Sequence, residues 1–255
     1  MPQKEFKNYK ISIILPNYNS SQYISSTIRS ILSQTYKNWK LIIVDDNSDK
    51  KTKIELSKFK KNKKIKIIWL KKNKGAAFCR NLAIKKSRSE YLAFIDSDDL
   101  WEKNKLKKQL FFMLKNNYNF TYTKYKFFKD GTKKFNKINI PNKLGFDNFI
   151  KNTSIATSTM MIKRKTADGI KFTNTKICED YYFKCQVLKK VKIAYSLKYY
   201  LTKYRIRHNS LQSNKLRNFY WIWKINSELN KLNLIKNLYS LLCISLNSIK
   251  KYGFK

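Results

Sequence analysis

Three aspartates within four positions, Asp96, Asp98 and Asp99, directly follow the mostly apolar run YLAFI (91–95). In an extended chain alternate side chains share a face, so Asp96 and Asp98 would point the same way. Two carboxylates this close repel each other and raise each other's pKa, and a divalent cation removes the repulsion. Oxygen ligands suit Mg²⁺ or Mn²⁺, which bind few protein carboxylates together with substrate phosphates. This segment is therefore a candidate metal and diphosphate site.

Helix capping is the alternative interpretation of the same segment. The sequence DLWE (99–102) has the pattern of a capping box, in which Asp99 would cap a helix and Glu102 would reach back to it. Capping accounts for Asp99 but not for Asp96 and Asp98. On these residues alone, both interpretations stay open.

Four short apolar runs in the first part of the chain predict buried strands. They are ISIIL (11–15), LIIV (41–44), IKIIWL (65–70) and YLAFI (91–95). Uninterrupted apolar runs are typical of strands that are covered on both faces, as in parallel sheets. Helices are expected from a cap at Ser20 or Ser21, over about 52–60 and over 74–87. Such strand–helix–strand units predict an α/β fold with a Rossmann-like, mostly parallel sheet flanked by helices.

Polar and acidic segments follow three of these strands directly. They are PNYN (16–19), DDNS (45–48) and DSDD (96–99). In doubly wound sheets, ligands bind outside the carboxyl ends of the strands. We therefore expect these three segments to share one site.

The second half of the chain shows a looser pattern. Its expected elements are a strand over 118–128, a short helix, a loop and a strand over 146–164, a helix over 179–190 and strands over 193–207. From about Leu216 the chain is helical, basic and aromatic.

The composition indicates a folded, strongly basic protein. Of the 255 residues, 42% are hydrophobic, which excludes a disordered tail and allows one large core. The formal net charge of +40 makes nucleic acid, an anionic membrane and anionic substrates candidate partners. Part of the excess is compositional background, because Lys, Asn and Ile are abundant along the whole chain.

Cysteine usage and hydropathy favour a reduced, cytosolic compartment. The four cysteines (Cys79, Cys178, Cys185 and Cys243) form no C-x-x-C pair. The first residues contain no stretch of signal-peptide type, and no run approaches the ~18 apolar residues of a spanning helix.

Two long stretches carry a family resemblance. SIILPNYNSSQYISSTIRSILSQTYKNWKLIIVDDNSD (12–49) and NKGAAFCRNLAIKKSRSEYLAFIDSDDLW (73–101) resemble the family 2 glycosyltransferases, which have the GT-A fold. The second half resembles the family more loosely, through CEDYYF (178–183) and YRIRHNSLQS (204–213). The resemblance implies inverting transfer of a sugar from a nucleotide-sugar donor.

The same resemblance implies a domain organisation. A GT-A domain over 1–215 would comprise a nucleotide-binding part at about 9–115 and an acceptor-binding part at about 116–215. Basic, aromatic C-terminal helices over 216–255 would follow it.

Roles for the first two strand ends follow from the resemblance. The PNYN loop would hold the base, with Pro16 shaping the turn, Tyr18 packing against the base and Asn19 beside it. Asp46 would accept a hydrogen bond from a uracil N–H, assisted by Asp45.

The DSD segment matches the D-x-D element of the family. Asp98 would bind the metal, Asp96 would bind the ribose or belong to the metal shell, and Ser97 would lie between them on the donor. Gly75 would allow close backbone approach, and Arg80 would support the acidic cluster or the phosphates. The alternative for Arg80 is an ordinary salt bridge near its own helix.

The late segments would supply the remaining groups. In the ED pair, Asp180 would be the general base and Glu179 would position the acceptor, although acidic residues at a helix start have a purely structural explanation. His208 is a candidate diphosphate contact, and Arg205 and Arg207 are weaker candidates.

The aromatic residues of the C-terminal helices have two interpretations. Phe219, Tyr220, Trp221 and Trp223 stand among Lys and Arg, so they could pack on the domain or adsorb to an anionic membrane.

The combined hypothesis is a Mn²⁺- or Mg²⁺-dependent inverting glycosyltransferase at the cytoplasmic face of a bacterial membrane. It would move a hexose or N-acetylhexosamine from a UDP-sugar to a glycan or lipid-linked acceptor of lipopolysaccharide, lipooligosaccharide or capsule. The UDP donor is inferred from Asp46, whose carboxylate suits the uracil imide. The sequence does not indicate an oligomeric state.

Two other classes stay open. A basic nucleic-acid-binding protein is suggested by the charge, but acidic strand ends would repel phosphate without a metal, so no nucleic acid is expected. A catalytically inactive relative is the other class, and the intact D-x-D and ED elements argue against it.

Overall fold

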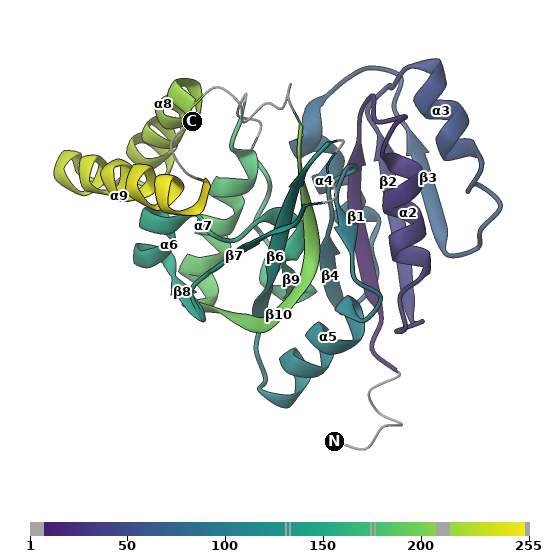
Figure 1. Cartoon of the computed structure of the whole chain (residues 1–255), viewed down its shortest axis with the longest axis horizontal. Coiled ribbons are helices and arrows are strands. Elements are labelled where there is room, and N and C mark those ends of the chain that lie inside the picture. The colour runs from purple at the N-terminus through teal and green to yellow at the C-terminus, as the bar shows by residue number, and fades with distance from the viewer. Residues whose placement is uncertain are drawn as a thin grey trace.

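The computed structural model describes residues 8–130, 132, 134–173, 175, 177–207 and 215–252, and these residues form one ten-stranded sheet flanked by helices (Figure 1). The strand order is β3-β2-β1-β4-β9-β6-β10-β5, with β7 paired to β6 and β8 paired to β10. The predicted fold class, a mixed α/β fold with a central sheet and a helical C-terminal part, is confirmed.

The first four strands are parallel neighbours, as the apolar runs predict. They are β1 (Ile11–Asn17), β2 (Trp39–Asp45), β3 (Ile65–Trp69) and β4 (Tyr91–Phe94). The helices between them are α2 (Ile24–Leu32), α3 (Lys50–Ser57) and α4 (Gly75–Lys86). Because parallel strands run the same way, PNYN, DDNS and DSDD all lie at the upper edge of the sheet in Figure 1.

The second half adds a mostly antiparallel part to the sheet. Its strands are β5 (Leu100–Trp101), β6 (Phe120–Lys129), β7 (Asn136–Ile138), β8 (Lys143–Gly145), β9 (Met161–Lys163) and β10 (Ile193–Ile206). Strand β9 runs antiparallel to both β4 and β6, whereas β6 and β10 are parallel. The segment 193–207, for which several strands were expected, forms the single long strand β10, with register shifts between Leu197 and Thr202.

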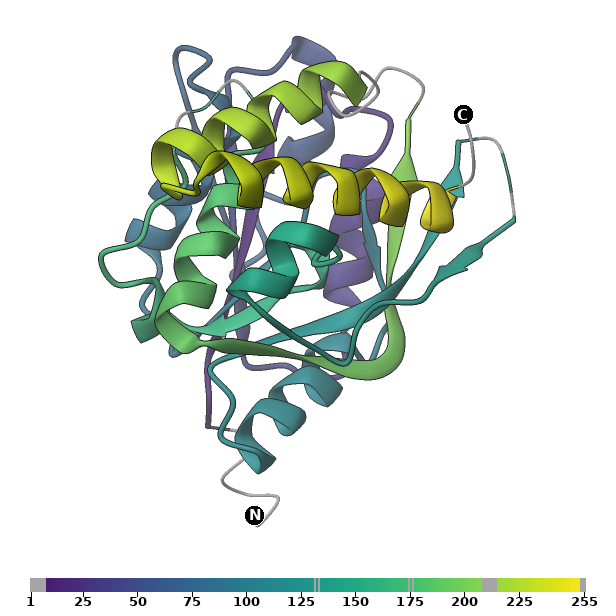
Figure 2. The ribbon, with the colours of Figure 1, turned by 90° about the vertical axis from the view of Figure 1, so that its left-hand side faces the viewer.

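The remaining helices complete the layers around the sheet. They are α5 (Lys105–Lys115), α6 (Phe146–Asn152), α7 (Glu179–Val191), α8 (Lys215–Lys224) and α9 (Leu234–Tyr252), with short turns η1 (Thr157–Thr159), η2 (Arg164–Ala167) and the π-helical η3 (Ile225–Leu229). Helices α8 and α9 pack against each other, and α9 lies across α6 (Figure 2).

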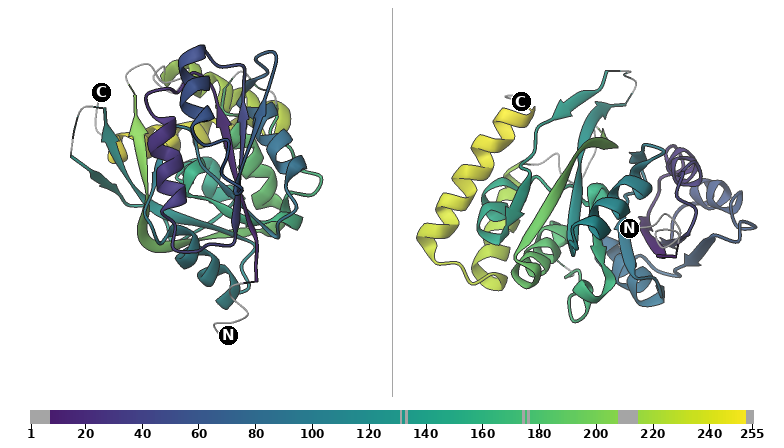
Figure 3. Two further views of the ribbon diagram at one scale, coloured as in Figure 1. Left: turned by 90° about the vertical axis from the view of Figure 1, so that its right-hand side faces the viewer. Right: turned by 90° about the horizontal axis from the view of Figure 1, so that it is seen from below.

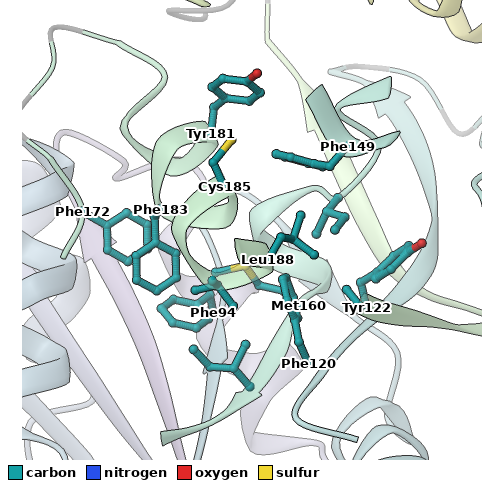
Figure 4. Close-up of a cluster of buried hydrophobic side chains, with 14 of the residues drawn as sticks. Phe94, Phe120, Tyr122, Phe149, Met160, Phe172, Tyr181, Phe183, Cys185 and Leu188 are labelled. Carbon is teal, nitrogen blue, oxygen red and sulfur yellow. The ribbon is translucent and has the colours of Figure 1, made fainter. Parts of the chain in front are cut away.

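Hydrophobic residues fill both faces of the sheet. In β4, Leu92 and Phe94 enter one cluster while Tyr91 and Ala93 enter the other, which is the alternation that a strand imposes. Helices α2, α3 and α5 cover the second cluster, and α4 and α7 cover the first. Figure 4 shows part of the first cluster, where the rings of Phe172 and Phe183 stack at 3.9 Å.

Two local predictions are wrong. Helix α2 begins after Tyr23 without a side-chain cap, because the backbone carbonyl of Ser20 accepts the N–H groups of Tyr23 and Ile24. The segment DLWE is not a capping box, since the next helix, α5, begins after Asn104. Strand β5 occupies that place instead.

The described helices do not include one that could cross a bilayer, because none combines sufficient length with sufficient apolar character. The four cysteines are free thiols, as expected.

Candidate functional site

The end of β2 is fixed by a buried hydrogen-bond network around Asp45. Asn17 Nδ2 donates to Asp45 Oδ1 over 2.8 Å, and the Ser48 hydroxyl donates to the same oxygen over 2.6 Å. The backbone N–H of Ser48 donates to Asp45 Oδ2 over 3.1 Å. Asp45 is fully buried, so its carboxylate holds the ends of β1 and β2 together.

The PNYN loop is tied to the same network. Asn19 has a left-handed backbone with φ 44°, a conformation that Asn tolerates better than most residues. Its N–H donates to Ser48 Oγ over 3.0 Å, and its side-chain oxygen accepts the Asp49 N–H over 2.8 Å. Pro16 pairs with Val44 inside the sheet. These contacts leave Tyr18 half-exposed at the rim of the site.

The carboxylate of Asp46 lies at the start of α4. Its two oxygens accept the backbone N–H groups of Lys74 and Gly75 over 2.7 and 2.8 Å. Gly75 has φ 85°, which disfavours any residue with a side chain. The nearly buried Asp46 therefore positions α4, a role that the sequence interpretation, with its uracil contact, did not include.

Arg80, on α4, joins two acidic segments that are distant in sequence. Its Nη2 donates to Asp96 Oδ1 over 2.7 Å, and its Nη1 donates to Glu179 Oε1 over 2.6 Å. The side chain is buried and lies 5.3 Å from the ring centroid of Phe172. Burial would lower the pKa of Arg80, but the charges of Asp96 and Glu179 outweigh burial and raise it. The guanidinium is thus a fixed positive charge, and the salt bridges reach beyond its own helix.

The DSDD segment turns sharply between β4 and β5. The Thr27 hydroxyl of α2 lies within 3.0 and 2.9 Å of the carbonyl oxygens of Ser97 and Asp99. The N–H of Asp96 donates to Ser158 Oγ over 3.0 Å. These contacts from α2 and η1 hold the backbone of the acidic segment from both sides.

Asp98 is a buried carboxylate with an altered pKa. Burial raises the pKa of Asp98 to about 6, against the opposing charge of Arg207 and with a further increase from Asp96. Arg207 Nε lies 2.7 Å from Asp98 Oδ2 as an ion pair. Arg207 was only a weak candidate for a diphosphate contact from the sequence, but the structure pairs it directly with the acidic segment.

Asp99 faces the last strand. Its Oδ1 accepts the backbone N–H of Arg205 over 2.9 Å, and the Arg205 side chain donates to the carbonyl of Asp98 over 3.0 Å. Burial, followed by the charges of Asp98 and Asp96, raises the pKa of Asp99 well above its usual range. Asp99 thus links the acidic turn to β10.

Arg205 also anchors the tip of β6. Its Nη1 donates to Asp130 Oδ1 over 2.6 Å, and the Tyr23 hydroxyl donates to Asp130 Oδ2 over 2.7 Å. The Arg205 guanidinium lies 4.7 Å from the centroid of the Tyr23 ring. Neither Tyr23 nor Asp130 was identified from the sequence. His208, the candidate diphosphate contact, lies outside the described residues.

The ED pair begins α7 immediately after a residue in left-handed conformation, Cys178, with φ 62°. Asp180 Oδ2 accepts hydrogen bonds from the Thr157 hydroxyl and from Lys184 Nζ, both over 2.6 Å. Burial alone would raise the pKa of Asp180, but Lys184 and then Arg80 outweigh burial and hold it well below its usual range.

The turn η1 connects the two acidic groups, and sequence analysis missed it. Thr157 donates to Asp180, and the adjacent Ser158 accepts from the backbone of Asp96. The Ser158 carbonyl in turn accepts the indole N–H of Trp101 over 2.8 Å. No spacing in the sequence indicates this link. Lys184, by contrast, could have been found as the i+4 partner of Asp180 on a predicted helix.

The acidic turn has the donor chemistry of a Mg²⁺ or Mn²⁺ site. Asp96 and Asp98 offer carboxylate oxygens, and the raised pKa of Asp98 reflects buried negative charge that a cation would relieve. The described part of the chain contains no group of three or more His, Cys, Asp or Glu side chains that could hold a metal ion by itself. Mg²⁺ and Mn²⁺ commonly bind few protein carboxylates together with substrate oxygens, so Asp96 and Asp98 suit such a site.

Comparisons with known proteins show which family the chain resembles. The family model "Glycosyl transferase family 2" matches residues 12–170. The teichuronic acid biosynthesis glycosyltransferase TuaG of Bacillus subtilis, whose assignment is provisional, is 36% identical over 94% of this chain and 96% of its own length. WfgD of Escherichia coli, named a UDP-Glc:alpha-D-GlcNAc-diphosphoundecaprenol beta-1,3-glucosyltransferase, is 34% identical over 97% of this chain and 96% of its own.

Solved structures share the fold. A crystal structure of residues 1–349 of S. aureus TarS with UDP-GlcNAc matches with a TM-score of 0.74 at 22% identity, covering 94% of this chain and 73% of that chain. The mannosyltransferase PcManGT from Pyrobaculum calidifontis, in complex with GDP-Man and Mn²⁺, matches with a TM-score of 0.69 at 12% identity, covering 97% of this chain and 72% of that chain.

Proposed function

The chain belongs to glycosyltransferase family 2, and we propose that it moves a hexose or N-acetylhexosamine from a UDP-sugar to a lipid-linked glycan during synthesis of a bacterial surface polysaccharide. The name of WfgD, with its UDP-glucose donor and diphosphoundecaprenol acceptor, supports both substrate classes for this chain. The name of TuaG supports a role in a cell-surface polysaccharide.

One observation carries the proposal. Arg80 holds Asp96, from the acidic turn, and Glu179, from the ED pair, within hydrogen-bond distance of one guanidinium. Arg80 thereby ties Asp96, in the turn that we propose binds the diphosphate, to Glu179, the residue before the proposed base Asp180. A transfer reaction needs the diphosphate site and the base on either side of the same sugar carbon.

We assign the donor to residues 9–115 and the acceptor to residues 116–215. On the donor side, the half-exposed Tyr18 is available to pack against the base, while Pro16, Asn19 and Asp45 fix its loop. Asp46 acts on the donor by positioning α4, which carries Gly75 and Arg80. A direct contact between Asp46 and uracil would have to share a carboxylate that already accepts two backbone N–H groups.

Asp98 and Asp96 would hold a Mn²⁺ or Mg²⁺ ion, with Ser97 between them in the same turn. Such a cation neutralises charge on a departing diphosphate. Arg80 keeps one oxygen of Asp96 oriented, and Arg207, directly after β10, lies beside Asp98.

Asp180 acts as the general base. An acceptor hydroxyl attacks the anomeric carbon while the bond from that carbon to the diphosphate breaks, and the hydroxyl proton passes to Asp180. Attack on the face opposite the leaving group inverts the configuration. Thr157 and Lys184 hold the carboxylate in place and keep it ionised, and Glu179 positions the acceptor from its bond with Arg80.

A donor screen tests this function. The purified chain with Mn²⁺ is incubated with UDP-glucose, UDP-GlcNAc, UDP-galactose and GDP-mannose, and released nucleotide is measured with and without a diphosphate-linked lipid acceptor. We expect one UDP-sugar to be used, with release stimulated by the acceptor. Release from none of the donors, together with a melting temperature raised only by DNA or RNA, would support the nucleic-acid-binding alternative instead.

The lipid-linked acceptor also gives the location of the reaction. An undecaprenyl-type acceptor is confined to a membrane, so we propose that the chain works at the inner face of the cytoplasmic membrane. Donor sugars of this class are made in the cytosol, which is consistent with the reduced cysteines.

A further inference from the structure

Helix α9 has an apolar face that the other described residues leave exposed. Six of its large apolar side chains are each more than half exposed: Leu234, Ile235, Leu238, Tyr239, Leu242 and Leu246. We call these six residues the α9 stripe. Their spacing of i, i+1, i+4, i+5, i+8 and i+12 places them on one side of a helix. Contiguous exposed apolar surface of this kind marks an interaction site.

The packed face of α9 is mixed: Ile244 is buried in the core cluster and Leu241 packs against it, next to two buried polar residues. Asn237 and Ser240 are fully buried, and Ser240 donates to the carbonyl of Ile150 over 2.6 Å. Asn237 donates to the carbonyl of Trp223 over 3.1 Å. A helix of a globular protein normally places its apolar side inward. In α9 the hydrogen bonds of Asn237 and Ser240, together with buried Ile244, fix an orientation that leaves the α9 stripe on the outside.

The position of α9 makes this face accessible. In Figure 2 the helix crosses the front of the molecule above α6, and in Figures 1 and 3 it forms the outer edge opposite α3. The α9 stripe runs from Leu234 to Leu246, so it extends over roughly 18 Å of the 19-residue helix.

The charges around the α9 stripe are mostly positive and favour an anionic partner. Residues 216–250 contain five basic residues and one acidic residue, Glu228; the basic ones are Arg217, Lys224, Lys231, Lys236 and Lys250. Lys151, on α6, lies with its Nζ 4.8 Å from the centroid of the Tyr239 ring. Lys236 borders the other end of the contact with α6, where it pairs with Asp147 over 2.7 Å.

We infer that the α9 stripe is a membrane-docking surface for anionic phospholipid, with the apolar side chains at the acyl boundary and the surrounding lysines at the headgroups. A helix with one apolar face and a basic surround binds in the plane of such a surface. A second copy of the chain fits less well, because two molecules of formal charge +40 repel each other.

The aromatic residues of α8 contribute less to this surface than the sequence had suggested. Phe219 packs against the core cluster, and Ile222 is buried. Tyr220 is exposed and contacts Trp221 edge-on. The docking surface therefore consists of the α9 stripe, whose residues were not singled out from the sequence.

Vesicle flotation tests the inference without any donor or acceptor. The wild-type chain, Leu242→Ser, and the double variant Leu238→Ser/Leu242→Ser are mixed with vesicles of phosphatidylglycerol and phosphatidylcholine or of phosphatidylcholine alone. Measurement at 0.5 M NaCl reduces the screening length to about 4 Å and suppresses purely electrostatic adsorption. Ile54→Ser is the matched control, since Ile54 is an equally exposed apolar residue on α3, at the opposite end of the molecule (Figure 3).

We expect binding to the anionic vesicles that weakens about fivefold in Leu242→Ser and about 25-fold in the double variant, and that is unchanged in Ile54→Ser. Equal binding of the double variant and the wild type would overturn the inference. The inference would also be overturned if the wild type formed a dimer and bound no vesicles while the double variant was monomeric, since the stripe would then be a contact between copies. Donor hydrolysis measured on the same samples reports separately on the transferase chemistry.

Discussion

Arg80 donates a 2.6 Å hydrogen bond to Glu179, a residue 99 positions further along the chain. The same guanidinium donates to Asp96, so a single buried side chain joins the acidic turn after β4 to the start of α7. The alignment of the proposed diphosphate site with the proposed base therefore depends on the planar, two-pronged shape of arginine.

Replacing Arg80 by Lys tests this alignment. One ammonium group cannot bridge both carboxylates, so we expect the free energy of unfolding to fall by about 2 kcal/mol. Transfer should slow by about 10- to 100-fold, because small displacements of reacting groups are costly. Arg164→Lys is the control, since Arg164 bonds the carbonyl oxygens of Ile84 and Ser87. Denaturant unfolding and steady-state transfer measure the two effects, and full activity in Arg80→Lys would contradict the bridging role.

Asp180→Asn tests the general base. The amide oxygen of Asn can still accept from Thr157 and Lys184, so the fold should be kept, whereas transfer should fall by about 10²- to 10⁴-fold. Asp147→Asn, at an exposed ion pair with Lys236, should transfer normally. If Asp180→Asn transferred sugar at the rate of the Asp147 variant, another group would have to be the base.

Lys184→Met tests what keeps Asp180 ionised. The folded-state pKa of Asp180 lies below its unfolded value, so its ion pair stabilises the protein above about pH 4 and is lost as the pH falls further. Without Lys184, the larger of the two charges that oppose burial is lost and only Arg80 remains, so the pKa of Asp180 rises. We expect the acid limb of the pH–rate profile to move up by about one unit or more, and a loss of about 3 kcal/mol in stability. If the acid limb of the pH–rate profile did not move, Lys184 would not be the group that keeps the base ionised.

Asp46→Asn distinguishes a structural role from a direct base contact. The amide NH₂ group of Asn would face one of the backbone N–H groups of Lys74 and Gly75, so unfolding should become easier by about 2 kcal/mol even without nucleotide. Thermal unfolding of the ligand-free chain measures this. A ligand-free stability equal to wild type, with only the preference for uracil changed, would favour the direct contact instead.

Lys105 is a buried amine beside the acidic turn but outside the proposed chemistry. It is fully buried, and its Nζ lies 3.7 Å from the centroid of the Trp101 ring. Burial lowers the pKa of Lys105 well below its usual range. At pH values between that lowered pKa and about 10.4, Lys105 is protonated in the unfolded chain but neutral in the folded one. The free energy of unfolding therefore rises with pH over this range.

Lys105→Met should remove that pH dependence. We expect the variant to be about 1–2 kcal/mol more stable than wild type at pH 7, with the difference narrowing as the pH approaches 10. Lys107→Met, an exposed position on the same helix, should leave the pH dependence unchanged. Denaturant unfolding from pH 6 to 10 measures these differences, and parallel curves for wild type and Lys105→Met would contradict the assignment.

The parallel half of the fold was predictable because local pattern determines it. Each strand from β1 to β4 is an apolar run followed by polar residues, and the rule for carboxyl ends then placed Asp46 and Asp98 at one edge. Asp180 was predicted from its resemblance to a family motif rather than from its surroundings.

Long-range pairing explains what the sequence could not predict. Thr157 and Ser158 lie in a short turn without a distinctive motif, and only the packing of β9 beside β4 brings them to Asp96. Asp99 resembled a helix cap, but it pairs with the backbone of Arg205 on β10. The orientation of helix α9 was likewise not predictable, because the tertiary hydrogen bonds of buried Asn237 and Ser240 accompany buried Ile244 on its packed face.

The most direct test of the central claim is the melting temperature of the wild-type chain and of Asp98→Asn with UDP, in the presence of Mn²⁺ or of EDTA. If the acidic turn binds a cation and through it a diphosphate, saturating UDP with Mn²⁺ should stabilise the wild type by about 3 kcal/mol, or roughly 5–10 °C. EDTA or the Asn substitution should remove most of that shift, while Asp147→Asn should keep it. An Asp98→Asn chain that UDP and Mn²⁺ stabilise as much as wild type would contradict the account.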